Sequence, residues 1–321
     1  MSDQLTSRID HLLQTSVDRG EVPGLAAAAA DTDGVRYSGA VGSRGAGPMT
    51  SDTVMWIASM SKVVTSVAAL QQVESGALDL DAPLADVLPE LAEVVVLTGF
   101  DDDGTPRTRP ARTPVTLRHA LSHTAGWGYE FWNADVARYH RERGVPPIIA
   151  CQEHTLADPL LFEPGTGWEY GTNIDWAGKA VERVTGTDLE RYLAEHVFAP
   201  LGMADTGFAI GGRRPRLAGM NARTADGGTT PMDFEMPQDP EFLMGGGGLY
   251  STPNDYLRFL RMLLGRGELG GTRVLAKELI EEGTRNQIGE LTIGRIRTVD
   301  PAISFDVDLL PGTTKKWGLL G

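Results

Sequence analysis

Residues 59–75, with the sequence SMSKVVTSVAALQQVES, form the most helix-like stretch of the chain. Apolar side chains recur there at helical spacing, and Gly76 follows as a stop signal. Ser59 and Lys62 are three positions apart, which places the serine hydroxyl and the lysine amine on one face of the helix. A desolvated lysine loses its proton readily and then serves as a base toward a serine. The stretch therefore predicts a helix that carries a nucleophile and its partner in proton transfer.

The position of Ser59 at the start of this helix adds a second feature. Backbone N–H groups at a helix N-terminus, with the positive end of the helix dipole, favour a developing oxyanion. The spacing alone leaves an alternative open, in which Ser59 caps the helix and Lys62 is solvated. The choice between the two interpretations rests on the other motifs of the chain.

The chain before this helix is rich in β-strand signals. Residues 24–30 are small and apolar, residues 31–34 fit a turn, and residues 35–41 alternate as a second strand does. Residues 99–114 are polar and contain prolines, so we expect a surface excursion there. Apolar spacing predicts helices over residues 1–17, 117–122, 175–185, 188–198 and 254–264.

Composition and charge exclude several classes of protein. The 321 residues are 41% hydrophobic and 22% charged, as in packed globular proteins, and the length suggests two domains. A net charge of −14 argues against partners such as nucleic acid or an anionic membrane surface. Cys151 is the only cysteine, and no stretch approaches the roughly 18 apolar residues of a membrane span. Because the N-terminal residues also lack a cationic start and an apolar run, we expect a cytoplasmic protein.

Metal and cofactor signals are weak. His119 and His123 have the spacing of two metal ligands on a helix, but position 120 is Ala and no third ligand is evident. The four glycines at 245–248 are not followed by the G-K-[ST] of a phosphate-binding loop. The sequence also contains no G-x-S-x-G, which excludes the nucleophile elbow of an α/β-hydrolase. We expect neither a metal nor a cofactor.

Five motifs occur in one order along the chain. They are SMSK at 59–62, HTAG at 123–126, PGTGWEY at 164–170, PLGM at 200–203 and GGGLYST at 246–252. In this order the chain resembles the serine β-lactamase-related family, in particular its esterase and transesterase branch. This branch comprises the family VIII carboxylesterases, which are related to class C β-lactamases. The resemblance covers the chain from about Pro23 to its last residue.

The resemblance implies roles for three residues. Ser59 would be the acylated nucleophile, Lys62 its partner in proton transfer, and Tyr170 the tyrosine that relays a proton to the leaving group and later activates water. A tyrosine suits this role only if a nearby ammonium lowers its pKa from about 10. The β-lactamases of the family have Asn two residues after this tyrosine, where this chain has Thr172, and Asn173 follows. The difference favours ester over β-lactam chemistry.

Several further residues are candidates for lining or supporting the site. The aromatic side chains among them would line an acyl or alcohol pocket, and ordinary packing is the alternative. The candidates are His123, Trp127, Tyr129, Phe131, Trp132, Asn173, Asp175, Gly246 and Gly247.

The resemblance implies an α/β (α+β) fold of the β-lactamase/transpeptidase type, an antiparallel sheet flanked by helices with a mainly helical second region. Residues 1–58 would begin the sheet domain, residues 59–244 would form the mainly helical region, and residues 245–321 would return to the sheet domain. Two strands cannot bury the core of a domain, and the segment KWGL at 316–319 resembles only the lead-in to the family's C-terminal strands. We therefore expect those strands, with the family's third motif (K-T-G or W-G-G), to be missing from this chain as part of a longer protein.

The sequence thus predicts a serine hydrolase that acts through an acyl-enzyme on Ser59. A carboxylesterase for small or medium esters, with acyl transfer to alcohols as an extension, fits best. A β-lactamase or D-amino-acid peptidase is one alternative, and a catalytically inactive member or fragment is another. The acyl group, the alcohol group and the oligomeric state stay open.

Overall fold

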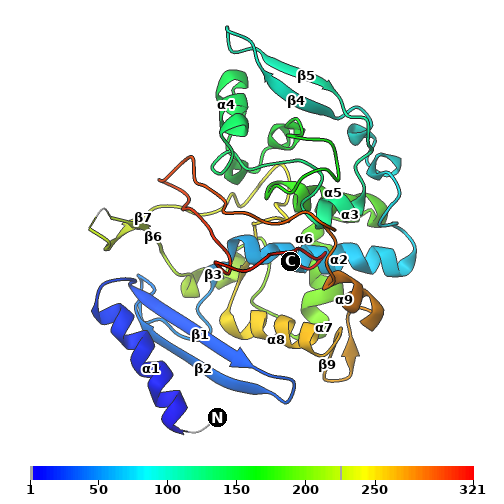
Figure 1. Ribbon diagram of the computed structural model, residues 1–321. Helices are drawn as coiled ribbons and strands as arrows, with labels where there is room; N and C mark the ends of the chain where they lie inside the picture. The colour runs from blue at the N-terminus through cyan, green and yellow to red at the C-terminus, as the bar shows by residue number, and fades with distance from the viewer. Residues whose placement is uncertain (1–2, 225) are drawn as a thin grey trace. The chain divides into compact units, whose positions relative to one another are not determined.

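The computed structural model describes residues 3–224 and 226–321 (Figure 1). Met1 and Ser2 of the predicted N-terminal helix lie outside the described residues. The chain divides into two compact units: Met1–Ala58, Ala194–Gln238 and Gly248–Val274 form the first, and Ser59–Leu193, Asp239–Gly247 and Leu275–Gly321 form the second. The division into residues 1–58, 59–244 and 245–321 stays a prediction.

The first unit contains an antiparallel hairpin. Strand β1 (Gly24–Ala30) pairs with β2 (Val35–Gly42). Gly24 lies opposite Gly42 at one end and Ala30 opposite Val35 at the other, so residues 31–34 form the turn. Helix α1 (Asp3–Asp18) packs against β2, and the Tyr37 hydroxyl donates a hydrogen bond to the Asp10 carboxylate at 2.6 Å. The two predicted strands and the N-terminal helix are therefore confirmed over the described residues.

Short strand pairs and one amphipathic helix complete the first unit. Helix α8 (Pro253–Leu264) packs against β1, and the Thr252 side chain caps its N-terminus by accepting the N–H of Asp255 at 3.2 Å. The remaining elements are β3 (Met55–Trp56), α7 (Ala199–Leu201), β6 (Met220–Arg223), β7 (Thr229–Met232), β8 (Tyr250–Ser251), β9 (Glu268–Leu269) and β10 (Thr272–Arg273). Antiparallel pairing joins β3 to β8, β6 to β7, and β9 to β10.

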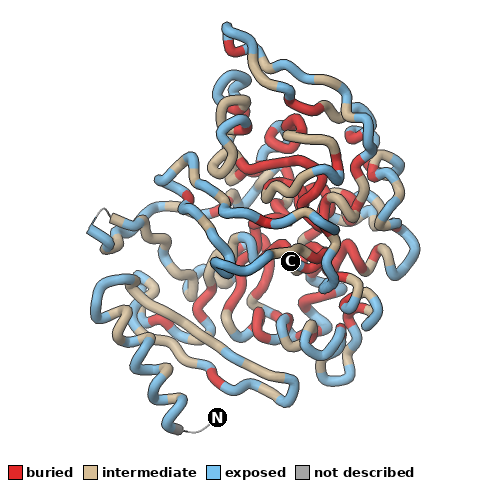
Figure 2. The backbone as a smooth tube through the Cα atoms, viewed as in Figure 1, coloured by how far each residue is buried: buried red, intermediate tan, exposed pale blue. Residues whose placement is uncertain are grey.

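The second unit is organised around helix α2 (Ser61–Ser75), whose residues are buried along most of its length (Figure 2). Small and β-branched side chains cover this helix, so other elements can approach it from several sides. It ends where expected, because Gly76 adopts the left-handed conformation (φ 77°) and its N–H bonds the carbonyl of Gln72. The helix predicted over residues 59–75 is confirmed, but it begins at Ser61, two residues later than expected.

Helix α5 (Asn173–Thr185) packs against α2, and a glycine allows the close approach. A methyl group on Gly178 would lie 3.1 Å from the Leu189 side chain and 3.5 Å from Thr65. The other elements of this unit are β4 (Val95–Phe100), β5 (Pro106–Pro110), α3 (Leu117–Leu121), α4 (Ala134–Arg143), α6 (Leu189–Leu193) and α9 (Lys277–Gly283).

Two elements of the second unit depart from the expectations. Residues 99–114 were expected to form a surface excursion, and the strand β5 within them, which was not predicted, pairs with β4 as an antiparallel hairpin. The proline at each end of β5 is tolerated because the strand lies at the edge of this two-stranded sheet. Helix α4 was not predicted, since it has few apolar residues; Asn133 caps its start and Gly144 (φ 66°) ends it. No helix in the described part of the chain is long and apolar enough to cross a membrane.

Leu70 lies within α2 and is 0% exposed. We expect Leu70→Ala to lower the free energy of unfolding by about 2–5 kcal/mol, because the truncation removes apolar burial and leaves a cavity. Leu264→Ala is the matched control at a side chain that is 52% exposed, and should cost less than about 0.5 kcal/mol. Urea unfolding followed by circular dichroism measures both, and equal losses would contradict the buried position of α2.

Candidate active site

Ser59 lies on a single 3-10 turn, Ala58–Met60, directly before α2. The residue before it, Ala58, has a φ of 45°, in the left-handed region that non-glycine residues rarely occupy. Such a conformation costs on the order of 1–3 kcal/mol and is concentrated at functional sites. Ser59 is exposed, whereas the next residues of the helix are buried. The N-cap position of α2 belongs to Met60, so the interpretation of Ser59 as a capping residue is wrong.

Lys62 is buried, with 5% of its surface exposed, and its amine meets three oxygen atoms. Nζ lies 3.3 Å from the Ser59 hydroxyl, 2.9 Å from the Tyr129 hydroxyl and 2.6 Å from the Gly246 carbonyl oxygen. Three acceptors match the three N–H groups of a lysine ammonium. The alternative interpretation, a solvated lysine after the serine, is therefore wrong.

Two tyrosines contact the lysine amine in different ways. The Tyr129 hydroxyl is bonded to it, whereas Tyr170 presents the face of its ring, with Nζ 4.7 Å from the ring centroid. Burial raises the pKa of Tyr129 well above its usual value, and the Asp175 carboxylate raises it further. Tyr129 is thus a neutral phenol at physiological pH. The sequence predicted Tyr129 only as a residue lining the pocket, whereas its hydroxyl is hydrogen-bonded to the Lys62 amine.

Aromatic rings form a continuous cluster next to the amine. The His123 ring stacks on Tyr170 with centroids 4.6 Å apart, and it meets the Trp317 ring at nearly a right angle with centroids 5.6 Å apart. Tyr129 stacks on Phe131 at 5.0 Å, and Phe131 meets Trp132 at 4.8 Å. Of the aromatic residues expected near a pocket, Tyr129, Phe131 and Trp132 are in mutual contact, whereas Trp127 stacks on Trp176 instead. Trp168 and Trp317 join the cluster.

The two histidines of the i, i+4 pair have separate partners. His119 belongs to a capping box at the start of α3, where its Nδ1 accepts the backbone N–H of Thr116 at 3.3 Å. His123 is buried, and burial together with Lys62 lowers its pKa well below the usual value. No group of three His, Cys, Asp or Glu side chains that could hold a metal ion occurs among residues 3–224 and 226–321.

Asn173 and Trp127 brace the wall behind the cluster. The Asn173 amide donates to the Trp127 carbonyl at 2.9 Å and lies 3.2 Å from His123 Nδ1. The Trp127 indole donates to the Asp158 carbonyl at 3.1 Å and stacks on Trp176 at 5.5 Å. Both side chains are buried, so they support the site from behind rather than line it.

The glycines at 245–247 form a turn whose backbone faces Lys62 and Asp175. The Gly246 N–H donates to Asp175 Oδ1 at 2.8 Å, and its carbonyl accepts from Lys62. The Thr65 hydroxyl holds the Gly245 carbonyl at 2.8 Å, and the Gly247 N–H bonds the Met244 carbonyl at 3.0 Å. Gly246 thus acts through its backbone, as a supporting residue of the site.

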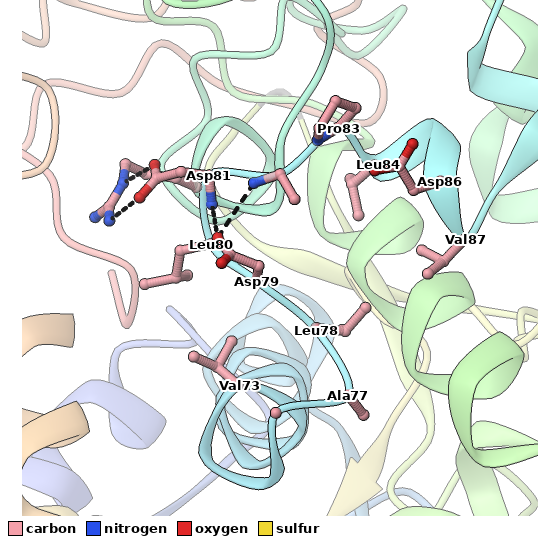
Figure 3. Close-up of a pocket in the computed structure, with 13 residues that line it drawn as sticks. Val73, Ala77, Leu78, Asp79, Leu80, Asp81, Pro83, Leu84, Asp86 and Val87 are labelled. Atoms are coloured by element: carbon pink, nitrogen blue, oxygen red, sulfur yellow. Dashed lines mark hydrogen bonds and ion pairs between the residues drawn. The ribbon is translucent and has the colours of Figure 1, made fainter.

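A hollow of about 110 Å³ opens beside the serine. Its lining includes Ser59, Lys62, His123, Tyr170 and Trp317. A larger surface hollow of about 550 Å³ lies at the C-terminal end of α2, next to Asp79, Asp81 and Arg118 (Figure 3). Arg118 is paired there with Asp81 at 2.7 Å, and this hollow has no nucleophile with a base beside it. The chemistry therefore places the candidate active site at the smaller hollow.

Comparison with known proteins assigns the family. The Beta-lactamase family model matches residues 9–295. This chain belongs to the β-lactamase family. The resemblance inferred from the five motifs is confirmed, and so is the β-lactamase/transpeptidase-like fold class.

Members of the family with esterase and acyltransferase names are similar to this chain. A lovastatin esterase from Penicillium rubens (strain ATCC 28089 / DSM 1075 / NRRL 1951 / Wisconsin 54-1255) is 37% identical over 274 residues, 80% of this chain and 68% of the relative. A monacolin J acid methylbutanoyltransferase from Aspergillus terreus is 37% identical over 269 residues, 79% of this chain and 65% of the relative. The chain thus spans about two thirds of the length of these relatives.

A solved structure of a related enzyme has a similar fold. Unliganded simvastatin synthase from Aspergillus terreus has a TM-score of 0.77 and is 33% identical, with 90% of this chain and 74% of that chain covered. The esterase and acyltransferase activities expected of this branch of the β-lactamase family match the names of these similar proteins.

Gly246→Ala tests the close contacts behind the lysine. Its methyl group would lie 2.7 Å from Asp175 Oδ2 and 3.1 Å from the Tyr129 hydroxyl. We expect the variant to lose about 1–3 kcal/mol of unfolding free energy through overpacking. Gly294→Ala, at a glycine with open space around it, is the control and should change stability by less than about 0.5 kcal/mol. Urea unfolding compares the two, and an unchanged Gly246→Ala midpoint would contradict the described packing.

Proposed function

We propose that this chain is a serine hydrolase that forms an acyl-enzyme on Ser59 and acts on small or medium carboxylic esters. The single observation that carries the proposal is the buried Lys62 amine 3.3 Å from the Ser59 hydroxyl. The relatives named as an esterase and an acyltransferase support the same chemistry, with an alcohol as a second acceptor for the acyl group. Cytoplasmic localisation stays a prediction.

The contacts of Lys62 support its role as the base. A neutral amine has two N–H groups and one lone pair. The Gly246 carbonyl and the Tyr129 hydroxyl accept the two N–H groups, at 2.6 and 2.9 Å, which leaves the lone pair for the hydroxyl of Ser59. Once the amine has taken the serine proton, all three of its N–H groups have an acceptor. The protein thus stabilises both protonation states without moving the lysine.

Acylation then follows from these positions. Ser59 Oγ gives its proton to Lys62 and bonds to the ester carbonyl carbon, whose oxygen takes the electron pair. The Ser59 backbone N–H is our candidate donor to that oxyanion. Collapse of the intermediate breaks the bond to the alcohol oxygen, which leaves with the proton returned from Lys62. Water or a second alcohol attacks the acyl group in the same way and restores the serine hydroxyl.

Proton relay to the leaving group requires a hydroxyl near the amine. The family motif assigns this role to Tyr170, which lines the hollow beside Ser59. We propose that Tyr129 shares it, because its hydroxyl lies 2.9 Å from the Lys62 amine, whose Nζ is also 5.1 Å from the centroid of the Tyr129 ring. As a neutral phenol, Tyr129 can donate a proton and accept one from the ammonium in the same step.

One observation disfavours β-lactam or D-amino-acid peptide chemistry. The amide of Asn173, the asparagine next to Thr172, is committed to the Trp127 carbonyl and to His123. Asn173 is fully buried and does not line the hollow beside Ser59, so its amide is not offered to a substrate there. The site lacks the amide that the β-lactamase motif places after its tyrosine, which supports ester substrates.

Ser59→Ala should abolish hydrolysis of p-nitrophenyl butyrate, with a loss of at least about 10³-fold in kcat, because the acyl-enzyme cannot form. A fluorophosphonate probe should label the wild-type protein and not this variant. Ser75→Ala, an exposed serine at the other end of α2, is the control and should retain both properties. Nitrocefin turnover faster than ester turnover would instead favour a β-lactamase, and no labelling of the wild-type protein would favour an inactive member.

Tyr129→Phe and Tyr170→Phe each remove a hydroxyl and keep the ring. We expect each to lower kcat for ester hydrolysis by about 10²–10⁴-fold, the size of a general acid–base contribution. Tyr139→Phe on helix α4 is the control and should leave kcat unchanged. If Tyr170→Phe retains full kcat while Tyr129→Phe does not, the relay belongs to Tyr129 alone; the opposite result removes Tyr129 from it.

A further inference from the structure

A buried carboxylate lies behind the lysine and is not explained by the Ser-Lys-Tyr chemistry. Asp175 is in the first turn of α5, is 0% exposed, and accepts the Gly246 N–H through Oδ1 at 2.8 Å. Its other oxygen, Oδ2, has no hydrogen-bond partner among the described residues. A buried carboxylate oxygen without a partner is unfavourable, so the position requires a reason beyond packing.

Gly246 connects this carboxylate to the lysine. Its N–H binds Asp175, and its carbonyl oxygen accepts from Lys62 at 2.6 Å. A methyl group built on Gly246 would lie 2.7 Å from Asp175 Oδ2 and 3.1 Å from the Tyr129 hydroxyl, so the carboxylate and the phenol flank the same Cα atom. Only backbone of a glycine fits between them.

The titratable groups that face Asp175 are Lys62, Tyr129 and Cys151. Lys62 carries the opposing charge once it is protonated, whereas Asp175 raises the pKa of both Tyr129 and Cys151, in each case after burial as the larger cause. Burial raises the pKa of Asp175 itself to about 6, with Lys62 as the main opposing influence. The carboxylate is thus ionised when the site works at neutral pH and above.

We propose that Asp175 is a positioning residue for Lys62: its negative charge holds the Gly246 backbone on the amine and balances the ammonium that forms during acylation. The inference rests on the proposed function, because it assigns Asp175 a place in the same acyl transfer. The competing explanation is purely structural, since an acidic residue in the first turn of a helix also stabilises the helix.

The positioning role and the purely structural role predict opposite effects on protein stability when the charge of Asp175 is removed. The pKa of Asp175 in the folded protein, about 6, is above its ordinary value of 3.8. The folded state therefore holds this proton more tightly than the unfolded state, and the ionised carboxylate lowers stability as pH rises through that window. Asp175→Asn removes the charge while the Asn oxygen can still accept the Gly246 N–H. At pH 8 the variant should keep or raise its Tm and still lose activity.

The experiment measures the rate of Ser59 labelling by an uncharged fluorophosphonate from about pH 5 to 9. In the wild-type protein the rate should fall below about pH 6, where Asp175 becomes protonated. In Asp175→Asn, Ser59 should be labelled about 10–100-fold more slowly at pH 8. The labelling rate of this variant should no longer decrease below about pH 6. Asp158→Asn is the matched control, because Asp158 is also buried but is paired with His140 at 2.6 Å. It should keep the wild-type labelling rate at pH 8 and the wild-type pH profile.

The outcomes separate the two proposals. If the wild-type protein is not labelled at Ser59, the proposed function itself fails. If the wild-type protein is labelled and Asp175→Asn has the same rate and pH profile, or loses Tm and rate in proportion, the positioning role is overturned. If Asp175→Asn does not fold, the wild-type profile decides, since a labelling rate without an inflection between about pH 5 and 7 is incompatible with the inference.

Discussion

The burial of one lysine amine among three oxygen acceptors is the constraint on which the second unit depends. Lys62 can be buried only because Ser59, Tyr129 and Gly246 supply its partners. Those partners come from three separate parts of the chain, so the turn before α2, the aromatic loop and the glycine turn must all be held in place. The small side chains of α2 and the close approach of α5 at Gly178 provide that rigidity.

The local parts of this arrangement could be predicted from the sequence. Ser59 and Lys62 are three residues apart on a helix, so helical geometry alone brings their side chains together. The hairpin of β1 and β2 and the ends of α2 and α5 likewise follow from turn residues and glycine stops. The charged, proline-bounded strand β5 has no apolar alternation, so the Asp103-Gly104 turn signal before it was not sufficient to predict a hairpin.

The non-local parts could not be derived in this way. Tyr129 and Tyr170 both lie in loops, and only the path of those loops decides that one presents its hydroxyl and the other its ring to Lys62. His123 illustrates the difficulty, because its φ of 58° redirects the chain six residues before Tyr129. Asp175 and Gly246 are 71 residues apart in sequence, and no periodicity connects them. The order of the motifs identified these residues as candidates, but it did not predict their contacts.

The contrast between an exposed Ser59 and a buried Lys62 has a consequence for the fate of the acyl group. In the proposed reaction, solvent reaches the Ser59 hydroxyl, whereas the Lys62 amine that exchanges its proton is buried. The proposed site implies that the partition between hydrolysis and transfer depends on which acceptor, water or an alcohol, occupies the hollow lined by His123, Tyr170 and Trp317. Because burial of apolar surface is favourable, an alcohol with an apolar body would displace water from those rings, and the proposed site could then serve both hydrolysis and acyl transfer.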